Sequence, residues 1–107
     1  MGRFVIAAFR SKASQQDALR TVLEKHRRVL RAEHLVTDRP PYAMQAADGT
    51  IIEVFEWRSV DAIAQAHRNK AVQALWAECD THCDYVPLAD LAESRHPFAE
   101  FDSLDLE

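Results

Sequence analysis

The chain has 107 residues, of which 48% are hydrophobic and 28% are charged, and its formal net charge is −4. This length allows one domain with a single core, and the composition is that of a globular protein rather than a disordered one. Because thirteen basic residues are scattered among seventeen acidic ones, the basic stripe that nucleic acids and anionic membranes require is not expected.

The first predicted strand lies within "RFVIAAFRSK", where six consecutive apolar residues run from Phe4 to Phe9. A continuous run of this kind indicates a strand that is buried on both faces. An amphipathic helix is predicted over 14–33, with Ser14 as its N-cap. Its apolar positions recur at three- and four-residue spacing and are Leu19, Val22, Leu23, His26, Val29 and Leu30. Three arginines on the same segment, Arg27, Arg28 and Arg31, are expected to form a solvated face.

A β-hairpin is predicted over 42–58. Strands at 42–46 and 51–58 flank Asp48-Gly49, a dipeptide that favours a tight type I′ turn because both residues tolerate positive φ. In the second strand, Ile51, Phe55 and Trp57 are expected on one face, with Ile52 and Val54 on the other.

A second helix is predicted to begin at Ser59, which can cap it. Its apolar phase slips near Asn69, so we expect two helical pieces with a break at about residues 68–70. "YVPLADL" predicts a short last strand, and Pro87 places this strand at a sheet edge or a bulge. The domain is expected to span 1–91, followed by an acidic C-terminal tail over 92–107 in which Phe98 and Phe101 act as anchors.

The predicted order of elements is β-α-β-β-α-β. This is the ferredoxin-like arrangement of the α+β class, a four-stranded antiparallel sheet with two helices on one face. Because the first and third strands are apolar on both faces, the second sheet face also needs a cover. At about 25 cal/mol per Å² of apolar surface, leaving it in water would be costly. A homodimer with the two sheets face to face is therefore expected.

The stretch "EVFEWRSVDAIAQAHRNKAVQALW" resembles the dimeric α+β barrel superfamily, in particular proteins like the antibiotic biosynthesis monooxygenases. In those proteins a strand that ends in Trp is followed by a cap, a helix start, a histidine and a second helical piece. The matching positions here are Trp57, Ser59, Ala62, Ile63, His67 and 72–76. The order of the predicted elements matches that of the superfamily over about residues 3–90. The residues themselves resemble it only over 53–76. It implies a homodimeric barrel with an apolar pocket between sheet and helices in each subunit.

Members of that superfamily include cofactor-free oxygenases of polycyclic aromatic substrates, haem-degrading enzymes and proteins with no known activity. The haem-degrading branch has its ligating histidine near the position of Ala77, which cannot ligate. Zinc is not expected either, because Cys79, His82 and Cys83 do not share one helix face. With only two glycines in the chain, phosphate-cradling loops are absent. We therefore expect no cofactor and no metal.

Two residues are predicted as catalytic groups, His67 and Tyr42, since either could deprotonate or orient a substrate hydroxyl. A structural alternative for His67 is a histidine that donates to a carbonyl at the helix–sheet boundary. Pocket walls are predicted at Phe55, Trp57, Arg58, Ile63, Trp76 and Tyr85. Trp57 can equally fill a core, and the helical spacing of Trp76 from Val72 and Cys79 favours a core position for it.

Two functions remain open at this point. One is a small monooxygenase acting on an aromatic or quinone-type molecule. The other is a non-catalytic dimer that binds a small apolar or aromatic ligand or is associated with stress. No leader and no run of about 18 apolar residues is present, so a cytoplasmic protein without a membrane span is expected. A disulfide between Cys79 and Cys83 within one helix is geometrically awkward, so we expect buried thiols.

Overall fold

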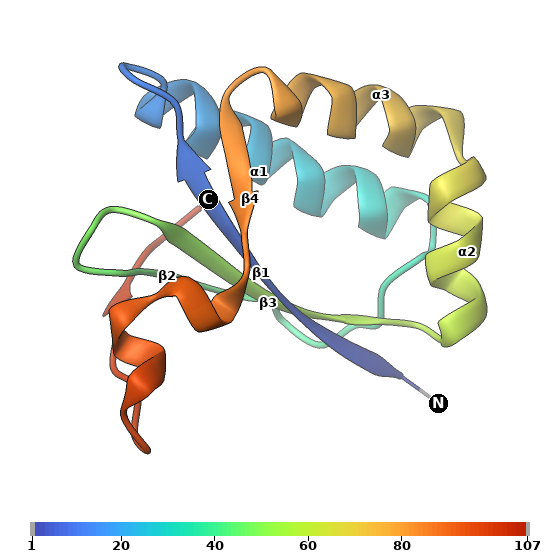
Figure 1. The fold of residues 1–107 in the computed structure, drawn as a ribbon. Coiled ribbons are helices and arrows are strands. Elements are labelled where there is room, and N and C mark those ends of the chain that lie inside the picture. The colour runs from blue at the N-terminus through green and yellow to red at the C-terminus, as the bar shows by residue number, and fades with distance from the viewer. Residues whose placement is uncertain (1, 107) are drawn as a thin grey trace.

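The structure is a computed structural model that describes residues 2–106. Within this range the chain is an α+β protein (Figure 1), with a five-stranded antiparallel sheet and three α-helices. The helices pack on one face of the sheet, and a segment with two short 3-10 helices packs against part of the other face.

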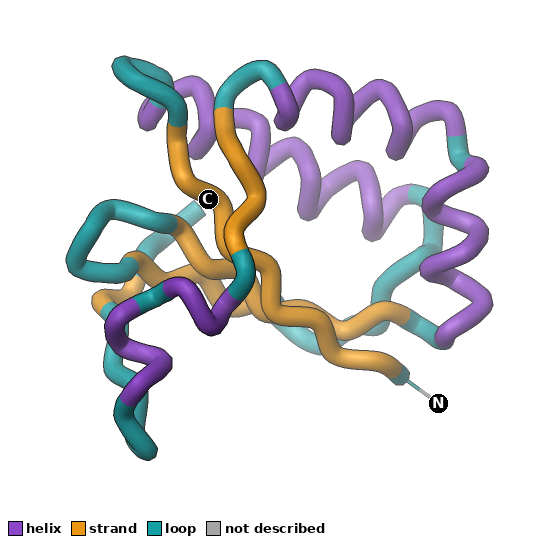
Figure 2. Tube along the Cα trace, in the orientation of Figure 1, coloured by secondary structure: helices purple, strands orange, loops and turns teal. Residues whose placement is uncertain are grey.

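The elements follow one another along the tube in Figure 2. In chain order they are β1 (Arg3–Ser11), α1 (Gln16–Ala32), β2 (Tyr42–Gln45), β3 (Ile51–Trp57), α2 (Val60–Arg68), α3 (Lys70–Asp80), β4 (Cys83–Val86), η1 (Leu88–Asp90), η2 (Ala92–Arg95) and β5 (Asp102–Ser103).

The sheet has the strand order β4-β1-β3-β2-β5, and every pair of neighbours is antiparallel. The longest pairing joins the two apolar strands β1 and β3, from Arg3 opposite Trp57 to Phe9 opposite Ile51. The sequence predicted four strands, and the fifth, β5, was missed. It comes from the expected C-terminal tail, and its two polar residues, Asp102 and Ser103, carry no apolar alternation that could reveal a strand.

The helix side of the sheet holds most of the core. Helix α1 buries the apolar stripe expected from its spacing, and α3 runs beside α1 over the same face (Figure 1). From the sheet, Phe9 and Ile51 pack against the apolar residues of α1 and α3, while Trp57 packs against α2 and the end of α1.

The second face of the sheet is covered only in part. The cross-strand row Ala8–Ile52–Met44 packs against Leu91 and Phe101, which the chain folds back from its C-terminal part. The next row consists of Ile6, Val54 and Tyr42; Val54 at its centre packs against the covered cluster, but Ile6 and Tyr42 at its ends have no such cover. Ile6 is 49% exposed and Tyr42 is 67% exposed. The chain itself thus supplies part of the cover that the sequence analysis expected from a second copy.

The predicted break in the second helix is confirmed. Helix α2 ends at Arg68 and α3 begins at Lys70, and each helix has its own cap. The hydroxyl of Ser59 accepts a hydrogen bond from the Ala62 backbone N–H, and the side-chain oxygen of Asn69 accepts one from Val72, both at 3.1 Å. The phase slip in the sequence therefore marks a real change of helix axis.

Two local predictions are wrong. Ser14 is not the N-cap of α1: that position is Gln15, which makes no side-chain cap bond, and Ser14 adopts a left-handed φ of 62°. The hairpin turn is not type I′, which needs two central residues with positive φ. Only Gly49 has one, and its N–H bonds to the Ala46 carbonyl at 2.9 Å. This is the pattern of a turn closed by a glycine in the left-handed region.

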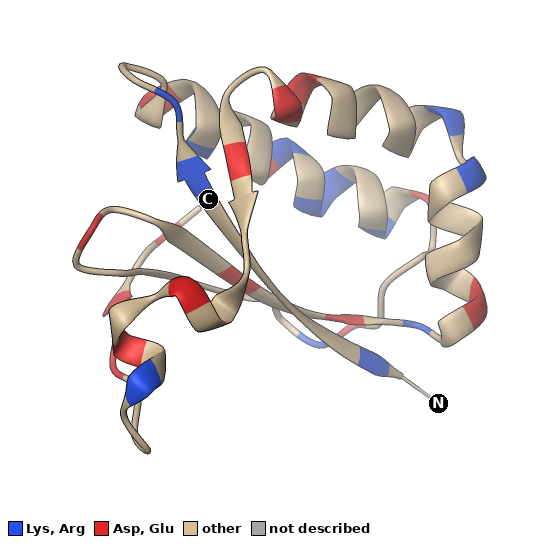
Figure 3. Ribbon diagram, viewed as in Figure 1, with Lys and Arg blue, Asp and Glu red and all other residues tan. Residues whose placement is uncertain are grey.

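The charged residues form no single-sign patch over the sheet (Figure 3), although Lys and Arg gather along α1. Two arginines of the expected solvated face, Arg28 and Arg31, are exposed. Arg27 instead turns inward to a buried carboxylate. Over residues 2–106 we find no helix whose length and apolar character would let it cross a bilayer.

Candidate functional site

An open pocket of about 380 Å³ lies between the sheet and α3. Strands β1, β3 and β4 supply its floor, and α1 and α3 supply its walls. The lining residues are Val5, Ala7, Phe9, His26, Phe55, Trp57, Trp76, Cys79, Asp80 and Tyr85. This volume is within the range of small-molecule sites, and such a site typically combines many apolar walls with few polar groups.

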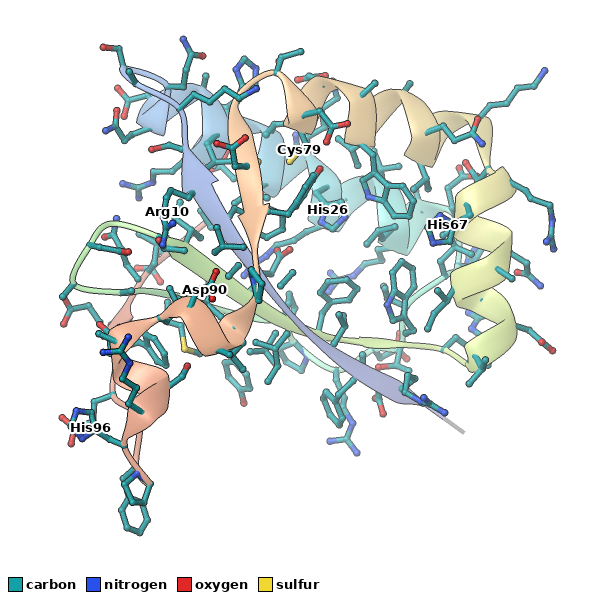
Figure 4. The ribbon with its side chains drawn as sticks, in the orientation of Figure 1. Arg10, His26, His67, Cys79, Asp90 and His96 are labelled. Carbon is teal, nitrogen blue, oxygen red and sulfur yellow. The ribbon has the colours of Figure 1, made fainter. Side chains whose placement is uncertain are left out.

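The central polar group of this pocket is His26, which α1 directs into the space between helices and sheet (Figure 4). The indole N–H of Trp76 donates to Nε2 of His26 at 3.2 Å. An indole N–H can only donate, so Nε2 carries no proton and Nδ1 must carry it. The Nδ1–H then donates to Oε1 of Glu53, 3.2 Å away. The contacts of His26 thereby define a neutral imidazole with a single tautomer.

Glu53 holds this imidazole from the middle of the sheet. It stands in the cross-strand row Ala7–Glu53–Ala43 on the helix side, and none of its surface is exposed. A buried carboxylate is costly unless it is paired and hydrogen-bonded. Its second oxygen accepts a hydrogen bond from Nε of Arg27 at 3.1 Å, which supplies the opposite charge. The three side chains form a closed network from α1 to β3.

Neither His26 nor Glu53 was predicted as a site residue, although the sequence holds a signal for both. His26 occupies an apolar position in the stripe of α1, and Glu53 occupies the inward position between Ile51 and Phe55 in β3. Each is a titratable residue at a core position. Two such residues on neighbouring elements suggest a buried pair, because each alone would be unsatisfied.

Four of the predicted pocket residues line this pocket: Phe55, Trp57, Trp76 and Tyr85. Phe55 packs edge-on against both Trp57 and the His26 ring, with centroids 5.2 and 5.8 Å apart. Tyr85 packs edge-on against Phe9 at 5.6 Å. Burial and the neighbouring Asp80 carboxylate raise the pKa of the Tyr85 phenol, so its hydroxyl keeps its proton at neutral pH.

The other predicted residues do not line this pocket. His67 is exposed on α2 (Figure 4) and packs edge-on against the Trp76 ring, with centroids 5.1 Å apart. Tyr42 lies in the partly covered row of the opposite sheet face. Arg58 is exposed just after β3, and Ile63 packs from α2 into the core around Trp57. His67 and Tyr42 therefore lie outside the pocket as it is formed here.

Metal coordination finds no support within residues 2–106. No group of three His, Cys, Asp or Glu side chains in this range converges as metal ligands would. The side chain of His82 faces the other way from the two cysteines, with Nδ1 2.8 Å from the Gln15 amide oxygen.

The arrangement combines apolar and aromatic walls with one imidazole nitrogen of the kind that can accept a proton from a hydroxyl group. Aromatic side chains provide the walls, and Nε2 of His26 is an acceptor that becomes free for a ligand when the Trp76 N–H moves away. Glu53 stabilises the imidazolium that would result, as a carboxylate behind a catalytic histidine does. Comparisons of the chain with protein-family models, with curated proteins and with solved structures found no match.

Proposed function

We propose that this protein is a cofactor-independent monooxygenase that acts on a small planar aromatic molecule bearing a hydroxyl group. The observation that carries the proposal is a buried imidazole, His26, in the wall of an otherwise apolar and aromatic pocket, with its tautomer set by Glu53 and Trp76. The proposal agrees with the resemblance of 53–76 to the antibiotic biosynthesis monooxygenases, and it moves the proton acceptor from His67 to His26.

The reaction begins with proton transfer from the substrate hydroxyl to Nε2 of His26. The substrate anion gives one electron to molecular oxygen, and the resulting radical and superoxide combine at a ring carbon that carries hydrogen. The imidazolium returns its proton to the peroxide. Loss of water from the hydroperoxide leaves a carbonyl, so that one oxygen atom enters the quinone product and the other enters water.

The pocket supports this chemistry in two ways. Its aromatic walls, Phe9, Phe55 and Trp57, can hold the substrate ring by edge and face contacts. The apolar lining also strengthens the interaction between the imidazolium and the substrate anion once the bound ring displaces water from the pocket. Trp76 competes with the substrate for Nε2 of His26. The hydrogen bond from its indole N–H must therefore break before the substrate hydroxyl can donate to Nε2.

Oxygen uptake with a panel of hydroxynaphthalenes and hydroquinones tests the proposal, with an enzyme-free reaction subtracted. We expect one oxygen molecule consumed per substrate molecule. His26→Phe should reduce uptake at least about 100-fold, the usual contribution of a general base. Trp76→Phe frees Nε2 and should raise uptake, whereas the control Tyr42→Phe, on the opposite sheet face and outside the pocket, should leave it near the wild-type rate. Wild-type uptake in a folded His26→Phe variant contradicts the assignment.

A second function, ligand binding without catalysis, is favoured by one contact. In the structure Nε2 of His26 is already occupied by the Trp76 N–H at 3.2 Å, so no free base faces the pocket. A protein that binds the panel but consumes no oxygen in any variant would be a binding protein, and the monooxygenase proposal would then be wrong.

We also propose that β4-β1-β3-β2 form a ferredoxin-like βαββαβ unit, extended by β5, and that two copies pack sheet to sheet. The strand order and the antiparallel pairs support the first part. The second part rests on the partly covered row Ile6, Val54 and Tyr42, which crosses three adjacent strands. Phe4, 57% exposed, lies beside this row on β1. Burying such side chains is worth about 1.5–3 kcal/mol each.

A further inference from the structure

The two cysteines lie closer together than their place in the sequence suggested. The sequence was interpreted as one helix through Cys83, but α3 ends at Asp80 and the chain turns at Thr81 and His82. Cys79 is therefore in the last turn of α3, while Cys83 begins β4. Their Sγ atoms are 3.7 Å apart, and both thiols are free and buried.

The two thiols differ in what they face. Cys79 is among the residues that line the 380 Å³ pocket, and 5% of its surface is exposed, so an oxidant as small as hydrogen peroxide would have to approach its sulfur through this pocket. Cys83 is not among the lining residues, and its Sγ lies behind Cys79, 3.4 Å from the Cys79 carbonyl oxygen. In Figure 4 Cys79 lies at the junction of α3 and β4. Cys79 is thus the cysteine on the pocket side of the pair, and the Cys83 sulfur lies 3.7 Å from its own.

Hydrogen bonds to the Cys79 sulfur favour a thiolate at this position. A hydrogen bond from Cys83 lowers the pKa of Cys79 to about 7, against the effect of burial. A hydrogen bond from Tyr85 also lowers this pKa, and the Asp80 carboxylate raises it. The same hydrogen bond and burial raise the pKa of Cys83, which therefore keeps its proton. A thiolate is the reactive form of cysteine, and a neighbouring thiol can resolve what it forms.

We infer that Cys79 and Cys83 form a peroxide-reactive dithiol site, with Cys79 as the nucleophile and Cys83 as the resolving thiol. The Cys79 thiolate attacks one oxygen of hydrogen peroxide, the O–O bond breaks, and hydroxide leaves, so that Cys79 becomes a sulfenic acid. The Cys83 sulfur then attacks the Cys79 sulfur and its proton leaves with the sulfenic hydroxyl as water. The product is a Cys79–Cys83 disulfide, and the pair has lost two electrons to the peroxide. A dithiol reductant returns it to the free form.

The sulfur atoms must approach from 3.7 Å to about 2.05 Å, which is the length of a disulfide bond. The cysteines sit on either side of a turn rather than within one helix, so rotation of the two side chains can supply this movement. The site does not depend on the proposed oxygenase reaction, since it uses neither His26 as a base nor an aromatic substrate.

The first test treats the native protein with a small excess of hydrogen peroxide and measures its mass and its peptides. We expect the loss of two hydrogen atoms and a peptide that links Cys79 to Cys83, both reversed by dithiothreitol. Cys83→Ser should instead accumulate a sulfenic acid at Cys79 that dimedone traps. A Cys79→Ser variant that forms adducts at Cys83 as fast as wild type forms its disulfide would overturn the assignment of roles.

The second test needs no variant and so does not depend on a substituted core remaining folded. Iodoacetamide alkylation of Cys79 in the wild-type protein is followed by peptide mass spectrometry at several pH values. With a pKa of about 7, its rate should rise only about tenfold from about pH 6 to about pH 8, whereas an ordinary thiol gains roughly 80-fold over that range. An ordinary rise, together with no linked peptide after peroxide treatment, would contradict the inference.

Discussion

Glu53 is the residue on which the candidate site depends most. Its carboxylate is fully buried at the centre of the sheet, and it accepts hydrogen bonds from His26 on one oxygen and from Arg27 on the other. Removing one member of a buried charge pair leaves the other uncompensated, which costs more than the pair itself contributes. Glu53 therefore links the stability of the sheet to the orientation of the His26 ring.

Glu53→Gln should lower the free energy of unfolding by about 1–3 kcal/mol. The new amide keeps the shape of the side chain but removes the charge and turns an N–H₂ toward a donor of Arg27 or His26. The matched control is Glu78→Gln, because Glu78 pairs with Lys25 at 2.8 Å with side chains 41% and 47% exposed. That change should stay within about 0.5 kcal/mol.

Urea denaturation of both variants measures the difference, provided that the slope with denaturant is unchanged. If Glu53→Gln is no more destabilised than Glu78→Gln, the network does not hold the site as described.

At the level of elements, the sequence predicted the helices best, because their apolar periodicity was clear. The stripe of α1 and the phase slip near Asn69 led directly to the helices seen. The sequence-based prediction was wrong where an element depends on contacts with residues far away in the sequence. Strand β5 exists because β2 offers it an edge, and Ser14 lost the cap position because the chain turns sharply there with a left-handed φ. No local pattern encodes either outcome.

The junction between α2 and α3 depends on Asn69. Its side-chain oxygen caps α3 through Val72, and its N–H₂ donates to Glu33 at 2.7 Å. Asn69→Ala should lower the free energy of unfolding by about 1 kcal/mol, the usual cost of losing an N-cap. Asn69→Ser retains a capping oxygen and should keep most of that stability. Equal losses in the two variants, measured by urea denaturation, would mean that capping is not what Asn69 contributes.

At the scale of the whole molecule, the sequence predicted four aromatic residues that line one pocket, but the proton acceptor proposed from the structure, His26, was not among its predicted catalytic residues. His67 was predicted as a catalytic residue because it lies in the stretch 53–76 that resembles the monooxygenases, after a helix cap. His26 stands among apolar residues in the stripe of α1, and periodicity alone cannot distinguish a functional histidine there from one that only fills the core. The distinction needs the position of Glu53, which comes from another element 27 residues away.

Sedimentation of the intact chain tests the proposed pairing of two sheets. We expect a mass of twice 12.2 kDa, and Ile6→Glu should give single chains because it places a charge in the partly covered row. Val60→Glu is the matched control: Val60 is a 56% exposed apolar residue on α2, away from that face. A wild-type mass of one chain, or equal dissociation of the control, contradicts the dimer.

The most direct test of the central claim, that the pocket takes an aromatic hydroxyl onto His26, is calorimetric binding of a naphthol and of its methyl ether. We predict that the wild-type protein binds the naphthol about five- to twelvefold more tightly, since one hydrogen bond is worth about 1–1.5 kcal/mol. His26→Phe should bind the two compounds equally. Equal binding by the wild-type protein, or a preference that survives in a folded His26→Phe variant, would contradict this account.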